Sequence, residues 1–381
     1  MTNLFDNFFN KISEIFSLKS SGQSGASVLG IDIGASSIKI VQLANKKGSA
    51  VLQTYGEISL GPYAKTQIGR ATKLSAEKLA EALVDVLKES GSSTKNSSMS
   101  IPIRFSMVSV FKMPEMPRKQ LEKMVPVEAR KYIPVPISEV TLDWFVIPNL
   151  DERKEDGSLK NKKKGGSVEI MMVAIHNDIL ANYSNVVSAA QLDTSFFEIE
   201  MFSTARAVLD SGFLMPVMIV DVGAGATKVY ITERGVIRDS HTIGRGSQDL
   251  TLNLAKNLGI DIEFAEKLKR NYGQNEINQD QSIAENVDSV FNPIFATANE
   301  VLLKFEKRYN KNVSRVIMVG GGSLLTGLAD KAQKYFGIET VSGNPFEKVQ
   351  TPAFLEPVLA KTGVMFAGAI GLALRKLQEL E

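Results

Sequence analysis

A carboxylate and two glycines follow an apolar run in the stretch VMIVDVGAGATKVYI, residues 217–231. The β-branched residues before Asp221 are typical of a buried strand, and those after Lys228 predict a returning strand. Gly223 and Gly225 permit a tight turn whose backbone N–H groups approach a ligand closely. Backbone N–H groups in such a turn can donate hydrogen bonds to phosphate oxygens, and a carboxylate at a strand end can hold hydrated Mg²⁺. An ordinary glycine-rich β-turn has the same composition, so this stretch alone leaves both interpretations open.

A second stretch, VLGIDIGASSIKIVQL at residues 28–43, repeats the pattern. When Asp32 is placed on Asp221, Lys39 falls on Lys228 and the glycines after the carboxylates coincide. The separation is 221 − 32 = 189 residues, half of the 381-residue chain. This repeat predicts an internally duplicated protein in which each half presents one phosphate loop to a shared cleft.

The rarity of two residue types limits the chemistry that the chain can perform. Cysteine is absent, and histidine occurs only at His176 and His241. Disulfides and thiolate metal sites are therefore excluded, and neither a histidine-based zinc site nor a serine–histidine–aspartate triad is expected. The formal net charge of +2 provides no field that would draw the chain to nucleic acid. We find no apolar run of bilayer-spanning length and no signal peptide, and expect a protein of the reducing cytosol.

The order of apolar runs and breakers predicts an α/β chain with an insertion between its two halves. Three strands are expected within residues 28–60, and a helix over residues 75–90 with Ser75 as its N-cap. The insertion contains strands and helices, one of them at 117–133 interrupted by a proline, and has no counterpart after the second loop. The predicted division begins with an N-terminal helix and linker at 1–27 and the first half at 28–98. The inserted subdomain follows at 99–192, and the chain returns to the first half at 193–215. The second half occupies 216–362, with a smaller subdomain at about 240–312, and a closing helix rich in small residues occupies 363–381.

Residues 1–25 form a separate amphipathic stretch ahead of a Ser/Gly-rich linker. Apolar side chains recur there at helical spacing, namely Leu4, Phe5, Phe8, Phe9, Ile12, Ile15 and Phe16. The stripe fits a helix packed on the body, a frayed terminus, or a docking helix for a partner or a membrane. Because acidic and basic residues balance along it, a protein contact is favoured over a lipid contact. In the charged loop at 151–166, a solvated hairpin tip is favoured over a contact with acidic partners.

The two phosphate loops, the strand-to-turn sequence VIMVGGGSL at 316–324, and helices with small residues near the half boundaries form one pattern. It resembles the actin-like ATPase superfamily, which includes actin, sugar kinases, heat-shock chaperone ATPases and the cell-division protein FtsA. The resemblance covers residues 28–378. It implies an α/β, actin-like ATPase fold in which two duplicated ribonuclease-H-like domains, with an inserted α+β subdomain, clamp a nucleotide and Mg²⁺.

Within this superfamily, residues 118–145, RKQLEKMVPVEARKYIPVPISEVTLDWF, resemble the PilM family of type IV pilus assembly proteins. That family carries an E-A-x-x-Y-I-P-x-P run followed by a D-W pair in its inserted subdomain. The matching residues here are Glu128, Ala129, Tyr132, Ile133, Pro134, Pro136, Asp143 and Trp144. The stretch IVDVGAGATKVYI is also close to the form found in this family.

The resemblance assigns roles in binding ATP or ADP. Asp32 and Asp221 would hold Mg²⁺ through water molecules, since that ion dehydrates reluctantly. Glu266 and Lys269, at i and i+3 on a helix, would contact ribose and adenine, although a surface ion pair would have the same spacing. The remaining residues are Gly34, Ala35, Ser36, Ser37 and Lys39 around one side of the phosphates, Gly223, Gly225, Ala226 and Thr227 on the other side, and Gly320, Gly321, Gly322 and Ser323 in the adenosine turn.

One departure from the superfamily pattern concerns catalysis. Hydrolytic members place a carboxylate or amide to orient the attacking water. The candidate here is Glu200, which occupies the place of an E-P-x-A run of chaperone ATPases, but Met201 and Ser203 break that run. A glutamate that only packs or caps a helix fits the same position. Nucleotide binding is therefore expected and hydrolysis stays open, with the nucleotide acting as a clamp that favours one interdomain angle.

The sequence shows no second substrate pocket or phosphoacceptor, which favours a role in assembly. PilM-type proteins bind the short cytoplasmic N-terminal peptide of the membrane protein PilN, in a groove between the inserted subdomain and the first half. The resemblance implies a PilN-like partner here, a cytoplasmic location at the inner face of the membrane, and contacts with other platform proteins or further copies of the chain. The residues expected to line the groove, which would equally suit a core, are Arg104, Phe105, Val125, Ala129 and Tyr132.

The assembly role would also fit a related type II secretion machine. Two other functions are compatible with the superfamily. The first is an FtsA-like filament former tied to the membrane, although such anchors usually lie at the C-terminus, where LALRKLQELE continues a core-like helix. The second is a small-molecule kinase, for which the insertion shows no catalytic carboxylate with a sugar-contacting motif.

Overall fold

The computed structural model describes residues 26–147, 166–210, 212–272 and 281–380. The chain divides into two compact units, of which the smaller contains Ile103–Ser184 and the larger contains the remaining described residues on either side. The boundaries therefore differ from the predicted insertion at 99–192, because residues 96–101 form a strand in a sheet of the larger unit. The predictions for residues 1–25 and for the charged loop at 151–165 fall outside the described residues.

The first sheet of the larger unit has the strand order β3-β2-β1-β4-β8. Its central strand β1 pairs antiparallel with β2 and parallel with β4. Five of the seven β1 residues are buried, as expected of a strand that is covered on both faces. The strands are β1 (Ser27–Ile33), β2 (Ser37–Lys46), β3 (Ser49–Ser59), β4 (Asn96–Ile101) and β8 (Asp193–Ile199).

The second sheet repeats this arrangement in the order β11-β10-β9-β12-β13. Here β9 is the central strand, antiparallel to β10 and parallel to β12. The strands are β9 (Val217–Val222), β10 (Thr227–Glu233), β11 (Val236–Ile243), β12 (Arg315–Val319) and β13 (Thr340–Ser342). The same pairing directions in the same order confirm the duplication that the two Asp-x-Gly stretches predicted.

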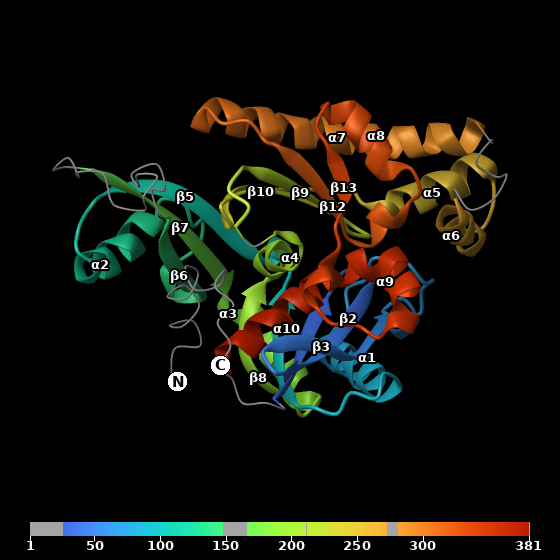
Figure 1. Ribbon diagram of the computed structural model, residues 1–381, viewed down its shortest axis with the longest axis horizontal. Coiled ribbons are helices and arrows are strands. Elements are labelled where there is room, and N and C mark those ends of the chain that lie inside the picture. Colours follow the sequence, from blue (N-terminus) through green and yellow to red (C-terminus); the bar gives the residue numbers. More distant parts are fainter. Residues whose placement is uncertain (1–25, 148–165, 211, 273–280, 381) are drawn as a thin grey trace. The chain divides into compact units, whose positions relative to one another are not determined.

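The helices of the larger unit surround these sheets (Figure 1). They are α1 (Ala76–Glu89), α4 (Glu200–Val208), α5 (Ser247–Leu258), α6 (Ile262–Asn271), α7 (Gln281–Tyr309), α8 (Leu328–Phe336), α9 (Glu356–Thr362) and α10 (Ala367–Glu379). The start of α1 confirms a prediction, because the Ser75 side chain accepts a hydrogen bond from the Lys78 N–H at 3.4 Å.

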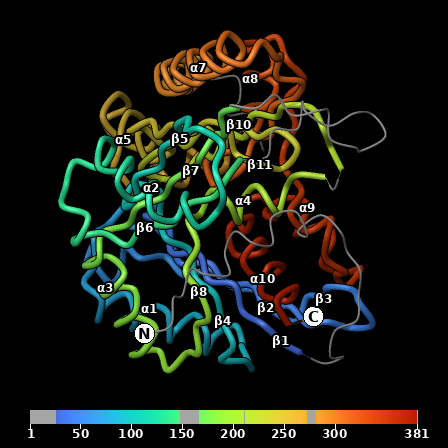
Figure 2. Tube along the Cα trace, turned by 90° about the vertical axis from the view of Figure 1, so that its left-hand side faces the viewer, coloured from blue at the N-terminus to red at the C-terminus, as the bar shows by residue number. Residues whose placement is uncertain are grey.

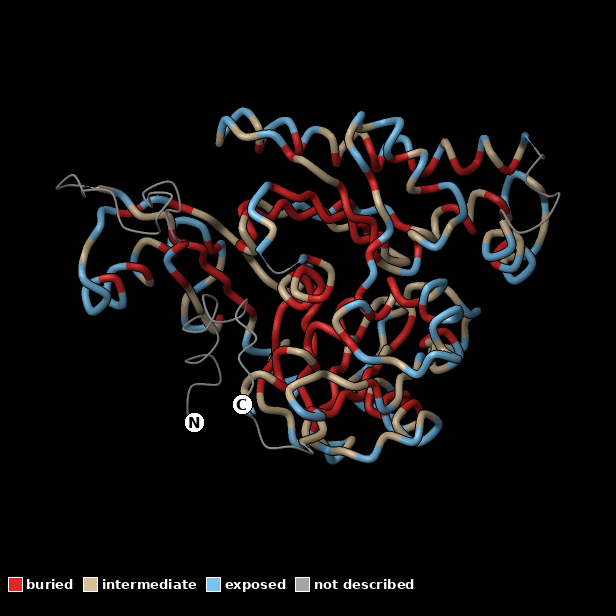
Figure 3. The backbone as a smooth tube through the Cα atoms, in the orientation of Figure 1, coloured by how far each residue is buried: buried red, intermediate tan, exposed pale blue. Residues whose placement is uncertain are grey.

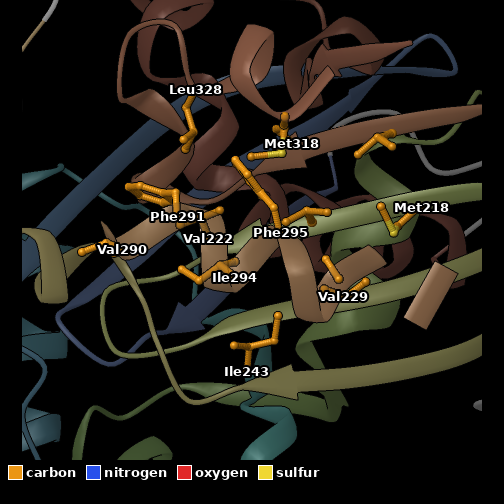
Figure 4. Packing of buried hydrophobic residues seen from close by; sticks show 14 of the residues in the cluster. Met218, Val222, Val229, Ile243, Val290, Phe291, Ile294, Phe295, Met318 and Leu328 are labelled. Carbon is orange, nitrogen blue, oxygen red and sulfur yellow. The ribbon is translucent and has the colours of Figure 1, made fainter. Parts of the chain in front are cut away.

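The core of the second half lies between its sheet and α7. Phe291 and Phe295 of α7 are fully buried against Met318 of β12 and Val222 of β9, and Figure 4 shows these side chains together. Figure 3 shows that burial is concentrated along the strands and the sheet-facing sides of the helices. Packing of this kind gives β9, which ends in Asp221 and Val222, a rigid support.

Glycines let α10 approach its neighbours at backbone distance. A Cβ at Gly30 of β1 would collide with the Ala369 carbonyl of α10, and one at Gly371 of α10 would collide with the Ser203 carbonyl of α4. Figures 1 and 2 both place α10 beside β2, and α10 also contacts β1, which Figure 2 labels. The prediction of a closely packed helix rich in small residues is confirmed.

The stretch Ala353–Glu379 is long and apolar enough to cross a membrane by length and composition, which corrects the expectation that no apolar run reaches that length. Within it, α10 buries Ile370, Leu372 and Leu377 and packs against β1, β2, β4 and α4. Its apolar residues therefore form part of the core between the first sheet and α4.

The smaller unit is a three-stranded antiparallel sheet in the order β5-β7-β6, packed with helix α2. Its strands are β5 (Ser106–Pro114), β6 (Val140–Ile147) and β7 (Ser167–His176), and its helices are α2 (Arg118–Ala129) and α3 (Asn177–Ala189), which runs on into the larger unit. Pro126 lies inside α2, as predicted, but the helix ends at Ala129, ahead of residue 133. Residues 99–114 are divided between β4 and β5.

Candidate nucleotide-binding site

Both predicted phosphate loops are hairpins with the same register. In each, the aspartate at the strand end lies opposite a lysine on the returning strand, and one N–H to carbonyl bond closes the turn. The opposed pairs are Asp32 with Lys39 and Asp221 with Lys228, and the turn bonds join Gly34 N to Ser37 O at 2.9 Å and Gly223 N to Ala226 O at 3.0 Å. The tip residues are partly exposed, and the N–H groups of Gly34 and Gly223 are used in the turn bonds.

The carboxylate of the first hairpin is oriented by the neighbouring strand β4. The Ser100 hydroxyl donates to Asp32 Oδ1 at 2.6 Å and accepts from the Ile33 N–H at 3.2 Å. Gly368 at the start of α10 lies against the same carboxylate, because a Cβ there would come within 2.9 Å of Asp32 Cγ. Sequence reasoning missed Ser100 and Gly368, whose separation from Asp32 along the chain gave no signal.

The second hairpin holds its carboxylate differently. The Lys228 ammonium donates to Asp221 Oδ2 at 3.1 Å and to Glu200 Oε2 at 3.0 Å. The Tyr230 hydroxyl, fully buried, donates to the same Asp221 oxygen at 3.1 Å. Glu200 is the first residue of α4 and is 7% exposed, so the candidate catalytic carboxylate forms an ion pair with Lys228.

The opposite charges of Lys228 and its two carboxylate partners stabilise each other's ionised form. Burial alone would lower the pKa of Lys228, but the carboxylates of Asp221 and Glu200 outweigh it and hold that pKa above its usual range. The pKa of Tyr230 is raised by burial and by the Asp221 carboxylate. The lysine is therefore charged and the tyrosine is a hydrogen-bond donor at physiological pH.

The predicted adenosine turn lies directly on the second hairpin. Gly320 follows β12 with φ 84° and ψ 162°, and a Cβ there would collide with Asp221 Oδ1 and come within 2.6 Å of the Val222 carbonyl. The Ser323 hydroxyl donates to the Gly320 carbonyl at 2.7 Å and closes the turn. The triple glycine thus permits a backbone approach to the phosphate loop that no side chain would allow.

Glu266 and Lys269 form the predicted pair on one face of α6, with Nζ 2.7 Å from Oε2. Glu266 also accepts from the Thr251 hydroxyl at 2.7 Å and from Arg270 Nε at 2.8 Å. Burial would raise the pKa of Glu266, but Lys269 and these hydrogen bonds lower it. The pair is largely buried, which distinguishes it from an ordinary surface ion pair.

A loop that sequence reasoning missed joins the two hairpins to α5 and α6. The Thr72 N–H donates to the Ala35 carbonyl at 2.9 Å, and the Ala71 N–H donates to Gln248 Oε1 at 3.0 Å. Gly69, with φ 87°, lies against Glu266, since a Cβ there would come within 2.7 Å of the carboxylate. The loop has no periodic pattern, and only its glycine hinted at a special conformation.

Thr227 and Lys39, both predicted near the phosphates, contact other groups of the protein in the structure. Thr227 is fully buried and its hydroxyl donates to the Arg245 carbonyl at 2.9 Å, so a role for that hydroxyl at the phosphates is wrong. Lys39 bonds the Ser37 hydroxyl at 2.6 Å and lies 3.3 Å from Glu57, so it pairs with a carboxylate of β3.

The residues predicted to line a peptide groove fall into two groups. Val125 and Ala129 are fully buried in the core between α2 and the small sheet, so they offer no surface and that part of the prediction is wrong. They lie four residues apart on the face of α2 that meets the sheet. Tyr132 is 42% exposed and stacks on Phe111 at 4.8 Å between ring centroids. Arg104 is exposed, with its guanidinium carbon 4.5 Å from the centroid of the Phe105 ring.

The carboxylates of the two hairpins already accept hydrogen bonds from other protein groups. Among the described residues, no group of three or more histidine, aspartate or glutamate side chains could hold a metal ion. One oxygen of Asp221 already accepts from Lys228 and Tyr230, and one oxygen of Asp32 accepts from Ser100. This donor set does not fit a directly coordinated Mg²⁺, which prefers octahedral oxygen ligands.

Two sheets of the same topology, each presenting an Asp-x-Gly hairpin, define an actin-like ATPase fold, and comparison with known proteins confirms it. The structure matches one described as a PilM-PilN type IV pilus biogenesis complex with a TM-score of 0.76 and 24% identity, over 92% of this chain and 98% of that chain. The ethanolamine utilization protein EutJ from Carboxydothermus hydrogenoformans matches with a TM-score of 0.51 and 17% identity, over 97% of this chain and 96% of that one.

Residues 30–377 match the family model of the type IV pilus assembly protein PilM, so the chain belongs to that family. Among curated proteins, the cell division protein FtsA of Agrobacterium fabrum is 25% identical over 229 residues, which are 54% of this chain and 50% of FtsA. FtsA of Neisseria meningitidis is 22% identical over 264 residues, 60% of this chain and 62% of that protein. The chain thus spans about half to three fifths of the length of these relatives.

Proposed function

We propose that this chain is a nucleotide-binding scaffold of a type IV pilus or related type II secretion assembly platform, working at the cytoplasmic face of the inner membrane. Its larger unit binds ATP or ADP, and its smaller unit contributes to docking the cytoplasmic N-terminal peptide of a PilN-like membrane protein. Membership of the PilM family supports the platform role. The related structure that contains both PilM and PilN supports the choice of partner.

The observation that carries the nucleotide proposal is the junction between the triple glycine and Asp221. At Gly320 the backbone passes so close to the Asp221 carboxylate that even a Cβ would collide with it. Such an approach gives a buried structural turn no advantage, whereas it places the exposed backbone of Gly321 beside a phosphate loop. The polar groups around the two hairpins then supply donors for the phosphates and the sugar.

Asp221→Ala is expected to weaken the binding of ATP and ADP about tenfold or more, which corresponds to at least ~1.4 kcal/mol. The physical reason is that Asp221 anchors both Lys228 and Tyr230 behind the phosphate loop. Isothermal titration calorimetry at fixed Mg²⁺ concentration measures the change. Asp330→Ala, at an exposed position on α8, is the control and should bind as the unaltered chain does. Equal affinities of the two variants would refute the proposed site.

Arg104→Glu is expected to weaken binding of the PilN-like peptide about tenfold, because it reverses an exposed charge and removes the cation that covers Phe105. Fluorescence anisotropy with a labelled synthetic peptide, matching the cytoplasmic N-terminus of the PilN-like protein from the same genome, gives the affinity. Lys119→Glu makes the same charge change at an exposed position of α2 and is the control. If both variants lose affinity equally, the contact is a non-specific charge effect and the assignment of Arg104 is wrong.

A further inference from the structure

The two hairpins are twins in register but differ in where their lysines point. The Lys39 ammonium donates to the Ser37 hydroxyl, and its carboxylate partner among the described residues is Glu57. Lys228 turns back to the aspartate of its own hairpin and bridges it to Glu200. Duplication alone therefore does not explain the second arrangement, which depends on a glutamate from α4.

The Lys228 ammonium lies where the carboxylates of the site converge. Asp221 is 8% exposed and Glu200 is 7% exposed, so both would repel each other strongly if no cation lay between them. Asp32 of the first hairpin adds to the attraction, since its charge also raises the pKa of Lys228. The Lys228 cation thus attracts acidic groups from three elements: β1, α4 and β9.

A hydrated divalent cation would have to share Asp221 with this ammonium. The shared oxygen already accepts from Lys228 and from Tyr230, so the ammonium occupies the position from which a cation would approach it. Ammonium and Mg²⁺ both neutralise carboxylates, but the lysine is covalently attached, so water is removed from its ammonium once, when the chain folds, whereas Mg²⁺ would have to dehydrate each time it binds.

We propose that Lys228 is a built-in cation that takes the place of a divalent metal at Asp221 and Glu200. It follows that the site does not bind free Mg²⁺ or Mn²⁺. A second consequence, which rests on the proposed nucleotide function, is that nucleotide affinity depends only weakly on Mg²⁺. Lys228 is a positioning residue, since it acts through the carboxylates that support the phosphate loop.

The first test uses the metal alone and does not require nucleotide binding. Mn²⁺ is titrated into the full chain and bound ion is followed by electron paramagnetic resonance. The unaltered chain and Lys228→Arg are expected to show no site tighter than about 1 mM, whereas Lys228→Met is expected to gain one. Lys256→Met, which removes an exposed lysine of α5, controls for the change in net charge. A Mn²⁺ site in the unaltered chain, or none in folded Lys228→Met, overturns the proposal.

The second test compares ADP affinity in Mg²⁺ and in EDTA by calorimetry. The unaltered chain is expected to change by less than about threefold, and Lys228→Met by more than about tenfold. A large loss of affinity in EDTA for the unaltered chain overturns the proposal. If the unaltered chain binds no nucleotide in either buffer, the proposed function fails, while the Mn²⁺ titration still decides the role of Lys228. Should Lys228→Met not fold, the unaltered chain and Lys228→Arg decide both tests.

Discussion

Glu198→Gln is expected to lower the free energy of unfolding of the larger unit by about 3–5 kcal/mol at neutral pH, because it leaves buried guanidinium groups without their carboxylate. Glu198 is 1% exposed at the end of β8. Its carboxylate accepts two hydrogen bonds of 2.7 Å from Arg206 of α4, and one of 2.9 Å from Arg375 of α10. The three residues therefore tie a strand to the two helices that cross beside it.

The same carboxylate predicts a loss of stability in acid. Burial would raise the pKa of Glu198, but Arg206 and Arg375 outweigh it and hold the pKa below its usual value. A carboxyl with a lowered folded-state pKa contributes stability above its unfolded pKa, about 4.3 for glutamate, and loses it as pH falls through the folded value. Between neutral pH and about pH 3, the unaltered chain should lose more stability than Glu198→Gln.

Urea unfolding followed by circular dichroism, repeated across this pH range, measures both effects. The control is Glu339→Gln, which alters an exposed ion pair with Arg315 of 3.1 Å in which the glutamate side chain is 57% exposed. Surface changes of this kind stay within about 0.5 kcal/mol. If the two variants unfold at the same urea concentration, the buried cluster does not stabilise the fold.

The fold was predictable because its strongest signal is local. Asp32 and Asp221 each sit in a strand–turn–strand pattern whose residues are neighbours in sequence, so the register of both hairpins follows from the letters alone. The triple glycine after a β-branched run was equally local. Two such hairpins half a chain apart then required two sheets of the same topology.

The candidate site was less predictable because its side chains are completed by distant elements. Lys228 pairs with Glu200, which lies 28 residues earlier and on a helix, and Ser100 reaches Asp32 across 68 residues. The sequence of a hairpin does not indicate which carboxylate its lysine will pair with. Val125 and Ala129 show the same limit on α2, since a helix pattern defines a buried face but not the sheet that covers it.

Gly320→Ala is expected to cost about 3 kcal/mol or more and to weaken nucleotide binding, because backbone strain and collision act together. With φ 84° and ψ 162°, Gly320 occupies a region that is essentially closed to residues with a Cβ. The added Cβ would also meet Asp221 Oδ1 and the Val222 carbonyl, which belong to the rigid central strand β9. The only relief is a shift of the turn away from the phosphate loop.

Gly327→Ala is the matched control for this effect. Gly327 lies seven residues later with φ 78° and ψ 0°, and a Cβ there meets nothing within 4 Å. Its replacement should therefore cost only the left-handed strain of about 1–2 kcal/mol and leave ADP affinity unchanged. Thermal unfolding and calorimetric titration of both variants separate strain from collision. Equal losses of stability with intact ADP affinity would show that the close approach of the turn to Asp221 does not shape the binding site.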